Sequence, residues 1–180
     1  RLHPLHGGLV EDAQEGSGLR GLPNRREEAQ RGGERWVSGD EGVAVLDRLL
    51  KELEEITSRL DEFIEKGYNL NDWRDQMAAL HALQVQAQIV LDIVQRLLSN
   101  MGVTAEGYKD AVRKLKERGL IDGSEERFLS AVVGFRNVIV HEYSEVDLST
   151  VEEILKKREY RRLLTLVMEL RKRAEKYWDP

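Results

Sequence analysis

The sequence contains no cysteine, which excludes disulfide-stapled scaffolds, thiolate metal sites and cysteine nucleophiles. Only three of its 180 residues are proline, and none lies between residues 42 and 179. Because an interior proline costs a helix about 3 kcal/mol, this long stretch without one favours helices. No uninterrupted apolar run approaches the roughly 18 residues of a membrane span, and no signal peptide is recognisable. We therefore expect a cytoplasmic protein without a membrane partner.

Motifs for several chemistries are also missing. The sequence has no Walker-type glycine loop and no GxGxxG, HExxH or GxSxG motif. The histidines at positions 3, 6, 81 and 141 do not have the spacing of metal ligands. We therefore expect no metal site and no cofactor. The net charge of −5 argues against a protein that binds nucleic acid through bulk positive charge.

The composition changes near residue 42. Residues 1–41 contain eight of the 15 glycines and two of the three prolines, and they show no periodic apolar pattern. Such a segment cannot bury enough apolar surface to offset the entropy of ordering it, so we expect an irregular or disordered tail. The first methionine is Met77, so we expect that residue 1 is not a natural start. Whether the tail is native stays open, and residues 42–180 form the predicted domain.

Apolar residues in this domain recur every three or four positions, which is the pattern of helices that bury one face. Capping residues mark where most of these helices begin or end. The predicted helices span about 43–66, 72–100 after Asn71, 105–118 before Gly119, a fourth from Ser124, and 149–177 from the capping box Ser149–Glu152. The only β-like stretch is short, at residues 138–140. The sequence therefore predicts an all-α, up-and-down bundle of about five helices.

The second predicted helix is apolar on more than one side, and one polar line runs along it. The side chains of this line step by three or four residues: His81, Gln84, Gln88, Asp92 and Gln95. A helix of this kind is either central in its own domain or half of a subunit interface. The polar line is either a solvated face or faces a cleft, where Asp92 would pair with an arginine because a buried carboxylate needs a partner.

Basic residues are concentrated in the last predicted helix, where residues 156–176 include nine basic and three acidic side chains. This helix either presents an ordinary solvated surface with ion pairs or attracts phosphate groups. The asymmetry of charge alone favours the solvated surface.

One segment near the end of the fourth helix, residues 135–143, combines three functional groups: Arg136, His141 and Tyr143. At 100° per residue, Arg136 and Tyr143 fall within about 20° of each other. Asn137 and His141 share a neighbouring face, so the whole set spans roughly 160°. This set suits a phosphodiester, because arginine binds phosphate with two hydrogen bonds and histidine moves a proton. An arginine and a histidine near a helix end are also common as structural residues.

The segment resembles the Rx4HxY motif of the HEPN superfamily, in the form typical of the HepT toxins of HepT–MntA toxin–antitoxin modules. Arg136, His141 and Tyr143 match the three motif residues, and Asn137 has the usual polar place after the arginine. The resemblance covers roughly residues 43–178. Beyond the motif it includes the line Gln84, Gln88 and Asp92, the predicted helix at 108–115, the link 119–122 and the segment 145–148.

The resemblance implies a helical homodimer with a composite cleft, in which Arg136 and His141 catalyse metal-independent cleavage of RNA. Asn137, Tyr143 and Asp92 would support them, with Asp92 orienting Arg136. The second helix would then belong to the dimer interface. The resemblance also implies an MNT-type nucleotidyltransferase antitoxin that neutralises the toxin by adding AMP to Tyr143.

Two other interpretations stay open at the level of the sequence. The domain is alternatively a non-catalytic HEPN module that only binds a nucleotidyltransferase partner. A further alternative is an unrelated helical adaptor in which the motif arose by chance. The sequence does not name the RNA substrate under any of these interpretations.

Overall fold

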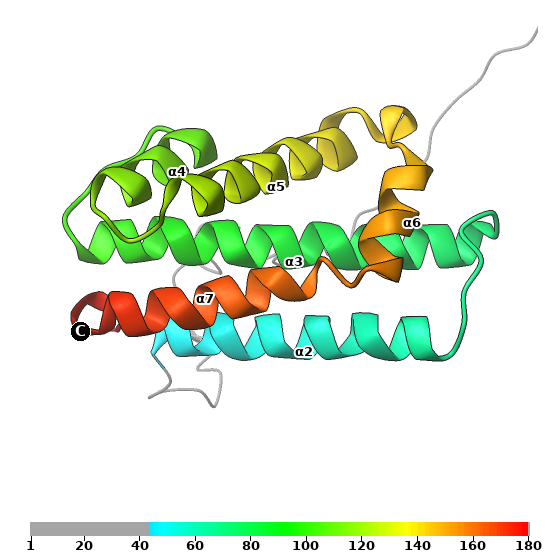
Figure 1. Cartoon of the computed structure of the whole chain (residues 1–180), viewed down its shortest axis with the longest axis horizontal. Coiled ribbons are helices and arrows are strands. Elements are labelled where there is room, and N and C mark those ends of the chain that lie inside the picture. The colour runs from blue at the N-terminus through cyan, green and yellow to red at the C-terminus, as the bar shows by residue number, and fades with distance from the viewer. Residues whose placement is uncertain (1–43, 180) are drawn as a thin grey trace, which may run out of the picture. The chain divides into compact units, whose positions relative to one another are not determined.

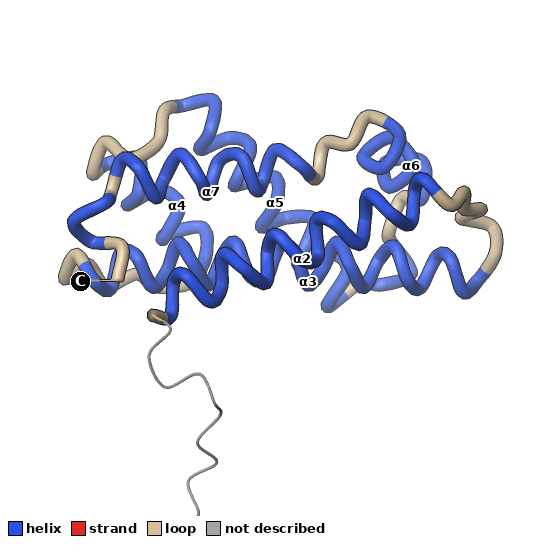
Figure 2. The backbone as a smooth tube through the Cα atoms, turned by 90° about the horizontal axis from the view of Figure 1, so that it is seen from below, coloured by secondary structure: helices blue, strands red, loops and turns tan. Residues whose placement is uncertain are grey.

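The structure, a computed structural model, describes residues 44–179. The predicted tail, residues 1–41, lies outside the described residues. The described part consists of helices and connecting loops and contains no strand (Figure 2), so the prediction of an all-α fold is confirmed. The elements are α2 (Val45–Glu65), α3 (Trp73–Asn100), α4 (Tyr108–Glu117), α5 (Gly123–His141), the 3-10 helix η1 (Tyr143–Glu145), α6 (Leu148–Lys156), α7 (Arg161–Arg173) and the 3-10 helix η2 (Glu175–Tyr177).

Helix α3 is the centre of the helical domain (Figure 1). Helix α2 packs against it as an antiparallel partner, and α7 contacts both of these helices. Helices α4 and α5 cover the other side of α3, while α6 crosses near the end at which α3 begins. The C-terminal end of α5 therefore lies at the same end of the domain as the N-terminal end of α3. This is the up-and-down arrangement that the sequence predicts.

The position of α3 explains why it is apolar on several sides. Twelve of its residues are buried, and it packs against α2, α4, α5 and α7 of the same chain. Although no uninterrupted apolar run is long enough, an 18-residue window of α3 has a mean hydropathy of 1.4, a value that a membrane-crossing helix also reaches. Its burial inside the bundle accounts for this apolarity. The composition of α3 therefore does not by itself require a second subunit.

Aspartates begin three of the helices. Asp72 caps α3, Asp122 forms a capping box with Glu125 at the start of α5, and Asp147 caps α6. A carboxylate accepts charge-assisted hydrogen bonds from the first backbone N–H groups and favours the positive end of the helix dipole. The caps predicted from the sequence are therefore wrong by one or two residues: Asp72 follows the predicted Asn71, while Asp122 and Asp147 precede the predicted Ser124 and Ser149.

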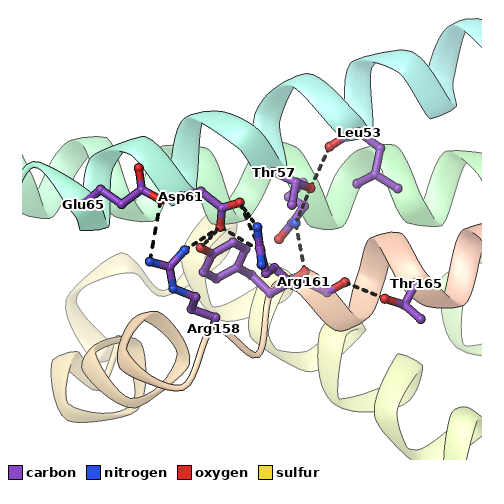
Figure 3. Close-up of polar contacts among 9 residues, drawn as sticks. Leu53, Thr57, Asp61, Glu65, Arg158, Arg161 and Thr165 are labelled. Atoms are coloured by element: carbon purple, nitrogen blue, oxygen red, sulfur yellow. Dashed lines mark hydrogen bonds and ion pairs between the residues drawn. The ribbon is translucent and has the colours of Figure 1, made fainter.

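The last predicted helix, residues 149–177, is in fact two helices, α6 and α7. The chain turns at Arg158, whose φ of 52° is left-handed and therefore strained for a residue with a side chain. The side chains of Arg158, Tyr160 and Arg161 all bond to Asp61 of α2, which holds the turn in place (Figure 3). Periodicity did not predict this break because Asp61 lies 100 residues before Arg161.

We name Asp61, Arg158, Tyr160 and Arg161 the Asp61 junction. Burial alone would raise the pKa of Asp61, but hydrogen bonds from Arg161 and Tyr160 and the two arginine charges bring this pKa below its ordinary value. Tyr160 is only 2% exposed, and its pKa is raised by burial and by Asp61. The fully buried Gln86 of α3 completes the contact between helices, since its Nε2 donates to the carbonyl oxygen of Tyr160 at 3.0 Å.

Candidate active site

The motif residues lie at the C-terminal end of α5 and in the turn that follows it. Arg136, Asn137 and His141 belong to α5, whose last residue is His141. The backbone leaves the helix at Glu142, with φ −134° and ψ 50°, and Tyr143 begins η1. The angle predicted between Arg136 and Tyr143 is therefore wrong, because it assumed that the helix continues to residue 143.

Neutral groups hold the side chain of Arg136. Its Nε donates to Oε1 of Gln88 at 3.1 Å, and its Nη1 donates to Oδ1 of Asn137 at 3.0 Å. The guanidinium also lies over the ring of Tyr108, 5.4 Å from the ring centroid, which is the distance of a cation–π contact. Among residues 44–179, Arg136 forms no ion pair, and its Nη2 donates no hydrogen bond. The arginine is therefore fixed in place without being neutralised.

The carboxylate of Asp92 contacts two residues that hold Arg136, Gln88 and Tyr108, rather than Arg136 itself. The amide nitrogen of Gln88 donates to Oδ1 of Asp92 at 2.9 Å and also bonds to the hydroxyl of Tyr108. The amide oxygen of the same side chain accepts from Arg136. The ion pair predicted between Asp92 and an arginine is thus not found within the described residues. Asp92 instead orients the amide of Gln88, which presents its oxygen to Arg136.

His141 lies on a face of α5 that no helix of the described chain covers. At 100° per residue it leaves the helix about 140° from Arg136, which turns toward α3. His141 and Ala131 are both exposed, and a Cβ added to Gly134 would meet nothing within 4 Å. These residues share one side of α5, together with the partly buried Val138. We call this side, defined by Ala131, Gly134, Val138 and His141, the open face of α5.

Tyr143 contacts the first turns of α3. Its hydroxyl donates to the Sδ atom of Met77 at 3.2 Å, and the side chain remains 44% exposed. Trp73 lies one helical turn before Met77 and is 71% exposed. Both the phenol and the indole are therefore accessible at the end of the domain where the motif lies.

The basic residues of the last part of the chain are engaged mainly in ion pairs. Arg158 and Arg161 pair with Asp61, Arg171 pairs with Asp47, and Arg173 pairs with Glu125. This favours the interpretation of a solvated surface with ion pairs. It also sets Arg136 apart from these arginines, since its hydrogen-bond partners are uncharged.

The described residues contain no group of three His, Cys, Asp or Glu side chains placed to hold a metal ion. Metal independence of the chemistry nevertheless stays a prediction. The arrangement offers a fixed cation, an exposed imidazole and an exposed phenol near one end of α5. These groups can bind an anion and transfer a proton.

Two neighbours of the motif were not identified from the sequence. Tyr108 lies under Arg136, but it stands 28 positions earlier and no local pattern connects the two. Trp73 could have been found, because steps of four residues continue the polar line of α3 backward from His81 through Met77 to Trp73. The polar members of that line end at His81, so polarity alone did not indicate the aromatic residue two turns before it.

Comparison with known proteins agrees with the fold and with the family that the sequence resembles. The profile of the family described as "Ribonuclease HepT-like" matches residues 49–170. A candidate RNase of Archaeoglobus fulgidus is 32% identical over 108 residues, which cover 60% of this chain and 80% of that protein. A candidate RNase of Methanocaldococcus jannaschii is 30% identical over 76 residues, which cover 42% of this chain and 87% of that protein.

Solved structures share the arrangement of helices at low sequence identity. YutE of Bacillus subtilis, a cytosolic protein of unknown function, superposes with a TM-score of 0.62 at 15% identity over 75% of this chain and 92% of YutE. A tri-AMPylated HEPN toxin of Shewanella oneidensis, solved in complex with its MNT antitoxin, gives a TM-score of 0.60 at 18% identity, with 68% of this chain and 96% of the toxin covered. These structures support the fold, while the match over residues 49–170 settles the family. The chain belongs to the HepT-like ribonuclease family.

Proposed function

We propose that this protein is the toxin of a HEPN/MNT toxin–antitoxin pair and cleaves RNA without a metal ion, in a cleft completed by a second copy of the chain. The observation that carries the proposal is the setting of Arg136. Two neutral amide oxygens hold its guanidinium, and no carboxylate of the described residues neutralises it. Its positive charge therefore remains available to a phosphodiester. Such a toxin would act in the cytoplasm, where its RNA substrate is found.

The proposed reaction is an attack of the RNA strand on itself. The 2′-hydroxyl oxygen bonds to the adjacent phosphorus, and the bond from phosphorus to the 5′-oxygen breaks. A neutral His141 takes the proton of the 2′-hydroxyl, and a protonated His141 gives a proton to the leaving 5′-oxygen. Arg136 binds the non-bridging oxygens and stabilises the charge that develops on them. The products carry 2′,3′-cyclic phosphate and 5′-hydroxyl ends.

The need for one proton acceptor and one proton donor supports a homodimer, because each motif has a single histidine. The open face of α5 is the surface that would pair, since it carries His141 beside small residues that let two helices approach closely. A groove of about 280 Å³ beside it is lined mainly by apolar residues of α3, α5, α6 and α7. The interface that we propose is therefore the open face of α5 and not α3, whose apolar sides are already buried.

The proposed switch is the addition of AMP to Tyr143 by an MNT-type nucleotidyltransferase. Its hydroxyl is on an exposed side chain two residues after His141. A transferred AMP would add negative charge and bulk where the phosphate of RNA must bind. The similar toxin from Shewanella oneidensis is itself AMPylated and bound to an MNT antitoxin. Modification of wild-type protein should raise its mass in steps of one AMP unit, and Tyr143→Phe should abolish this increase; AMP found on another residue would contradict the assignment.

The central test is cleavage of RNA by the purified protein in the presence of EDTA. We expect cyclic phosphate and 5′-hydroxyl ends, and we expect DNA to resist because it lacks the 2′-hydroxyl. A requirement for Mg²⁺ together with 5′-phosphate products would overturn the mechanism. Protein that binds its nucleotidyltransferase but never cuts RNA would instead be the non-catalytic HEPN module.

The dimer is tested separately by sedimentation. Gly134→Arg should convert a dimer to monomers, because the new side chain fits the open space around a single chain but blocks close pairing of two α5 helices. Ser58→Arg, at an exposed position of α2, is the matched control and should leave the dimer intact. Wild-type protein that sediments only as a 20.7 kDa monomer at micromolar concentration would contradict the composite cleft.

A further inference from the structure

Exposed apolar side chains gather at the end of the domain that carries the motif. Among residues 44–179, four large apolar side chains are exposed, and three of them lie where α3 begins and α5 ends: Trp73, Val140 and Tyr143. Trp73 is 71% exposed, whereas Trp178, the other tryptophan of the described chain, is 7% exposed. An indole that stays in water contributes little to the stability of the fold, so its place beside a candidate active site calls for a ligand.

We propose that Trp73, Met77 and Tyr143 form a stacking site for a nucleobase that carries an exocyclic amine. We call these three residues the stacking site. Met77 lies between the two aromatic side chains: it is one helical turn from Trp73 and accepts the hydrogen bond from the hydroxyl of Tyr143 at 3.2 Å. The inference rests on the proposed function, because the base belongs to a nucleotide whose phosphate reaches the motif.

The register of α3 aligns the stacking site with Arg136. At 100° per residue, Trp73, Met77, Gln84 and Gln88 fall within about 60° of one another, so they line one side of the helix. Gln88 is the residue that holds Arg136. From Trp73 to Gln88 the helix rises about 22 Å, which a few linked nucleotides can span. A strand whose phosphate is bound at Arg136 can therefore follow this side of α3 and place a base on Trp73.

The charges around Trp73 favour a base over a phosphate. Two carboxylates, Asp72 and Asp75, lie in the same turn and outnumber the one exposed guanidinium there, Arg74. The carboxylates accept hydrogen bonds from backbone N–H groups. They repel a phosphate, but they can accept hydrogen bonds from an exocyclic amine. Unpaired bases commonly stack on aromatic side chains in RNA recognition. Adenine, cytosine and guanine carry such an amine and uracil does not, so the stacking site should discriminate against uracil.

A nucleobase with an exocyclic amine could reach the stacking site from two sources. One is an unpaired base of the RNA substrate. The other is the adenine of an AMP attached to Tyr143, whose hydroxyl contacts Met77, the residue one helical turn from Trp73. In the first case Trp73 helps to bind the substrate, and in the second it holds the modified tyrosine in its inhibited position.

The experiment uses the full chain with Trp36→Phe, so that Trp73 and the buried Trp178 are the remaining tryptophans. Five-nucleotide 2′-deoxy oligomers of adenine or thymine serve as probes that cannot be cleaved, because they lack the 2′-hydroxyl. We expect the adenine oligomer to quench Trp73 fluorescence at saturation and the thymine oligomer to bind more weakly. With a labelled oligomer, Trp73→Ala should raise the Kd by about 5- to 150-fold, while Trp73→Phe keeps a ring and should retain most of the binding.

Met168→Ala is the matched control, since Met168 is also exposed, at 46%, but lies on α7. In the cleavage assay, Trp73→Ala should raise KM and leave kcat within a few-fold of wild type.

The stacking site would be overturned, and the ribonuclease left intact, if Trp73→Ala changed neither cleavage nor oligomer binding and Trp73 fluorescence were not quenched after AMP is attached to Tyr143. Trp73-dependent binding by a protein that cuts no RNA would support the stacking site and refute the ribonuclease. Quenching only after AMP addition would identify adenine of the modified Tyr143 as the base. Loss of the dimer in Trp73→Ala would show an interface residue and overturn the proposal.

Discussion

The Asp61 junction and the end of α5 both place arginines beside polar partners, yet they use the charge in opposite ways. At the junction, Arg158 and Arg161 share one carboxylate, and their charge is used to hold α2 against the turn between α6 and α7. At the end of α5, Arg136 is held by amide oxygens and by the face of a tyrosine ring. The comparison teaches that the partner, rather than the arginine, distinguishes a structural cation from one that is available to a ligand.

The largest effect should come from His141, the group at the end of α5 that we propose to move protons. His141→Ala should lower the rate of RNA cleavage by about 10²–10⁴, since this is the usual contribution of a general acid or base. The side chain is exposed in the single chain, so the variant should stay folded by circular dichroism. Because His141 lies in the proposed interface, sedimentation should be used to compare the variant only in its dimeric form. A variant that keeps wild-type activity would remove His141 from the mechanism.

Exchange of arginine for lysine should affect RNA cleavage at the end of α5 but not at the Asp61 junction. Arg136→Ala should lower cleavage by about 10²–10³, and Arg136→Lys should rescue it only in part, because lysine keeps the charge but loses the planar fork. Arg161→Lys at the junction is the control and should leave kcat unchanged. Equal losses of activity in the two lysine variants would mean that both arginines act through the fold.

Removal of the charge from Asp61 should weaken the fold and leave the chemistry alone. Asp61→Asn should lower the free energy of unfolding by about 2 kcal/mol at pH 7, because three side chains lose a charged acceptor. The folded pKa of Asp61 lies below its ordinary value, so the stabilisation is present above about pH 4 and is lost as the pH falls through the folded pKa. In urea unfolding, the free energies of unfolding of the wild type and of Asp61→Asn should therefore become equal at low pH. Glu62→Gln, at an exposed neighbouring position, should show little of this effect.

A single added carboxylate should make the end of α5 resemble the junction. Asn137→Asp puts a negative charge at the atom that accepts from Arg136 at 3.0 Å. Affinity for RNA should fall about tenfold, and the dependence of log Kd on log salt should lose about one unit of slope, as expected for one phosphate contact. Asn137→Ala removes the hydrogen bond without adding charge. If its salt slope falls as much as that of Asn137→Asp, neutralisation is not the cause.

The smallest effect should come from an arginine that is paired at the surface. Arg171 and Asp47 are 51% and 44% exposed, so their ion pair at 3.2 Å is screened by water and salt. Arg171→Ala should cost less than about 1 kcal/mol in thermal unfolding and should not change cleavage. A larger loss of stability would mean that Arg171 has a structural role like that of the arginines of the Asp61 junction.

The sequence predicted what is encoded locally and missed what depends on distant partners. The spacing of apolar residues located α2, α3, α4 and α5, and the Rx4HxY segment led to the family. The break at Arg158 could not be predicted, because its left-handed backbone is compensated by Asp61, far away in the chain. The contact between Arg136 and Tyr108 could not be predicted either, because the periodicity of apolar residues within one helix does not indicate which residues of another helix it contacts. The position of Tyr143 was missed because nothing in the pattern indicated that α5 ends at residue 141.

The long separation across the Asp61 junction also has a consequence for the order of synthesis. Asp61 leaves the ribosome 100 residues before Arg161, which corresponds to about 5–20 s at typical rates of translation. During this interval the hairpin of α2 and α3 has no α7 to cover it, although the residues of the motif have already been made. The bundle is complete only when the last helix emerges. The residues of the motif are therefore synthesised before the helix that completes the bundle around them, so the motif comes to lie in a complete bundle only after α7 has been made.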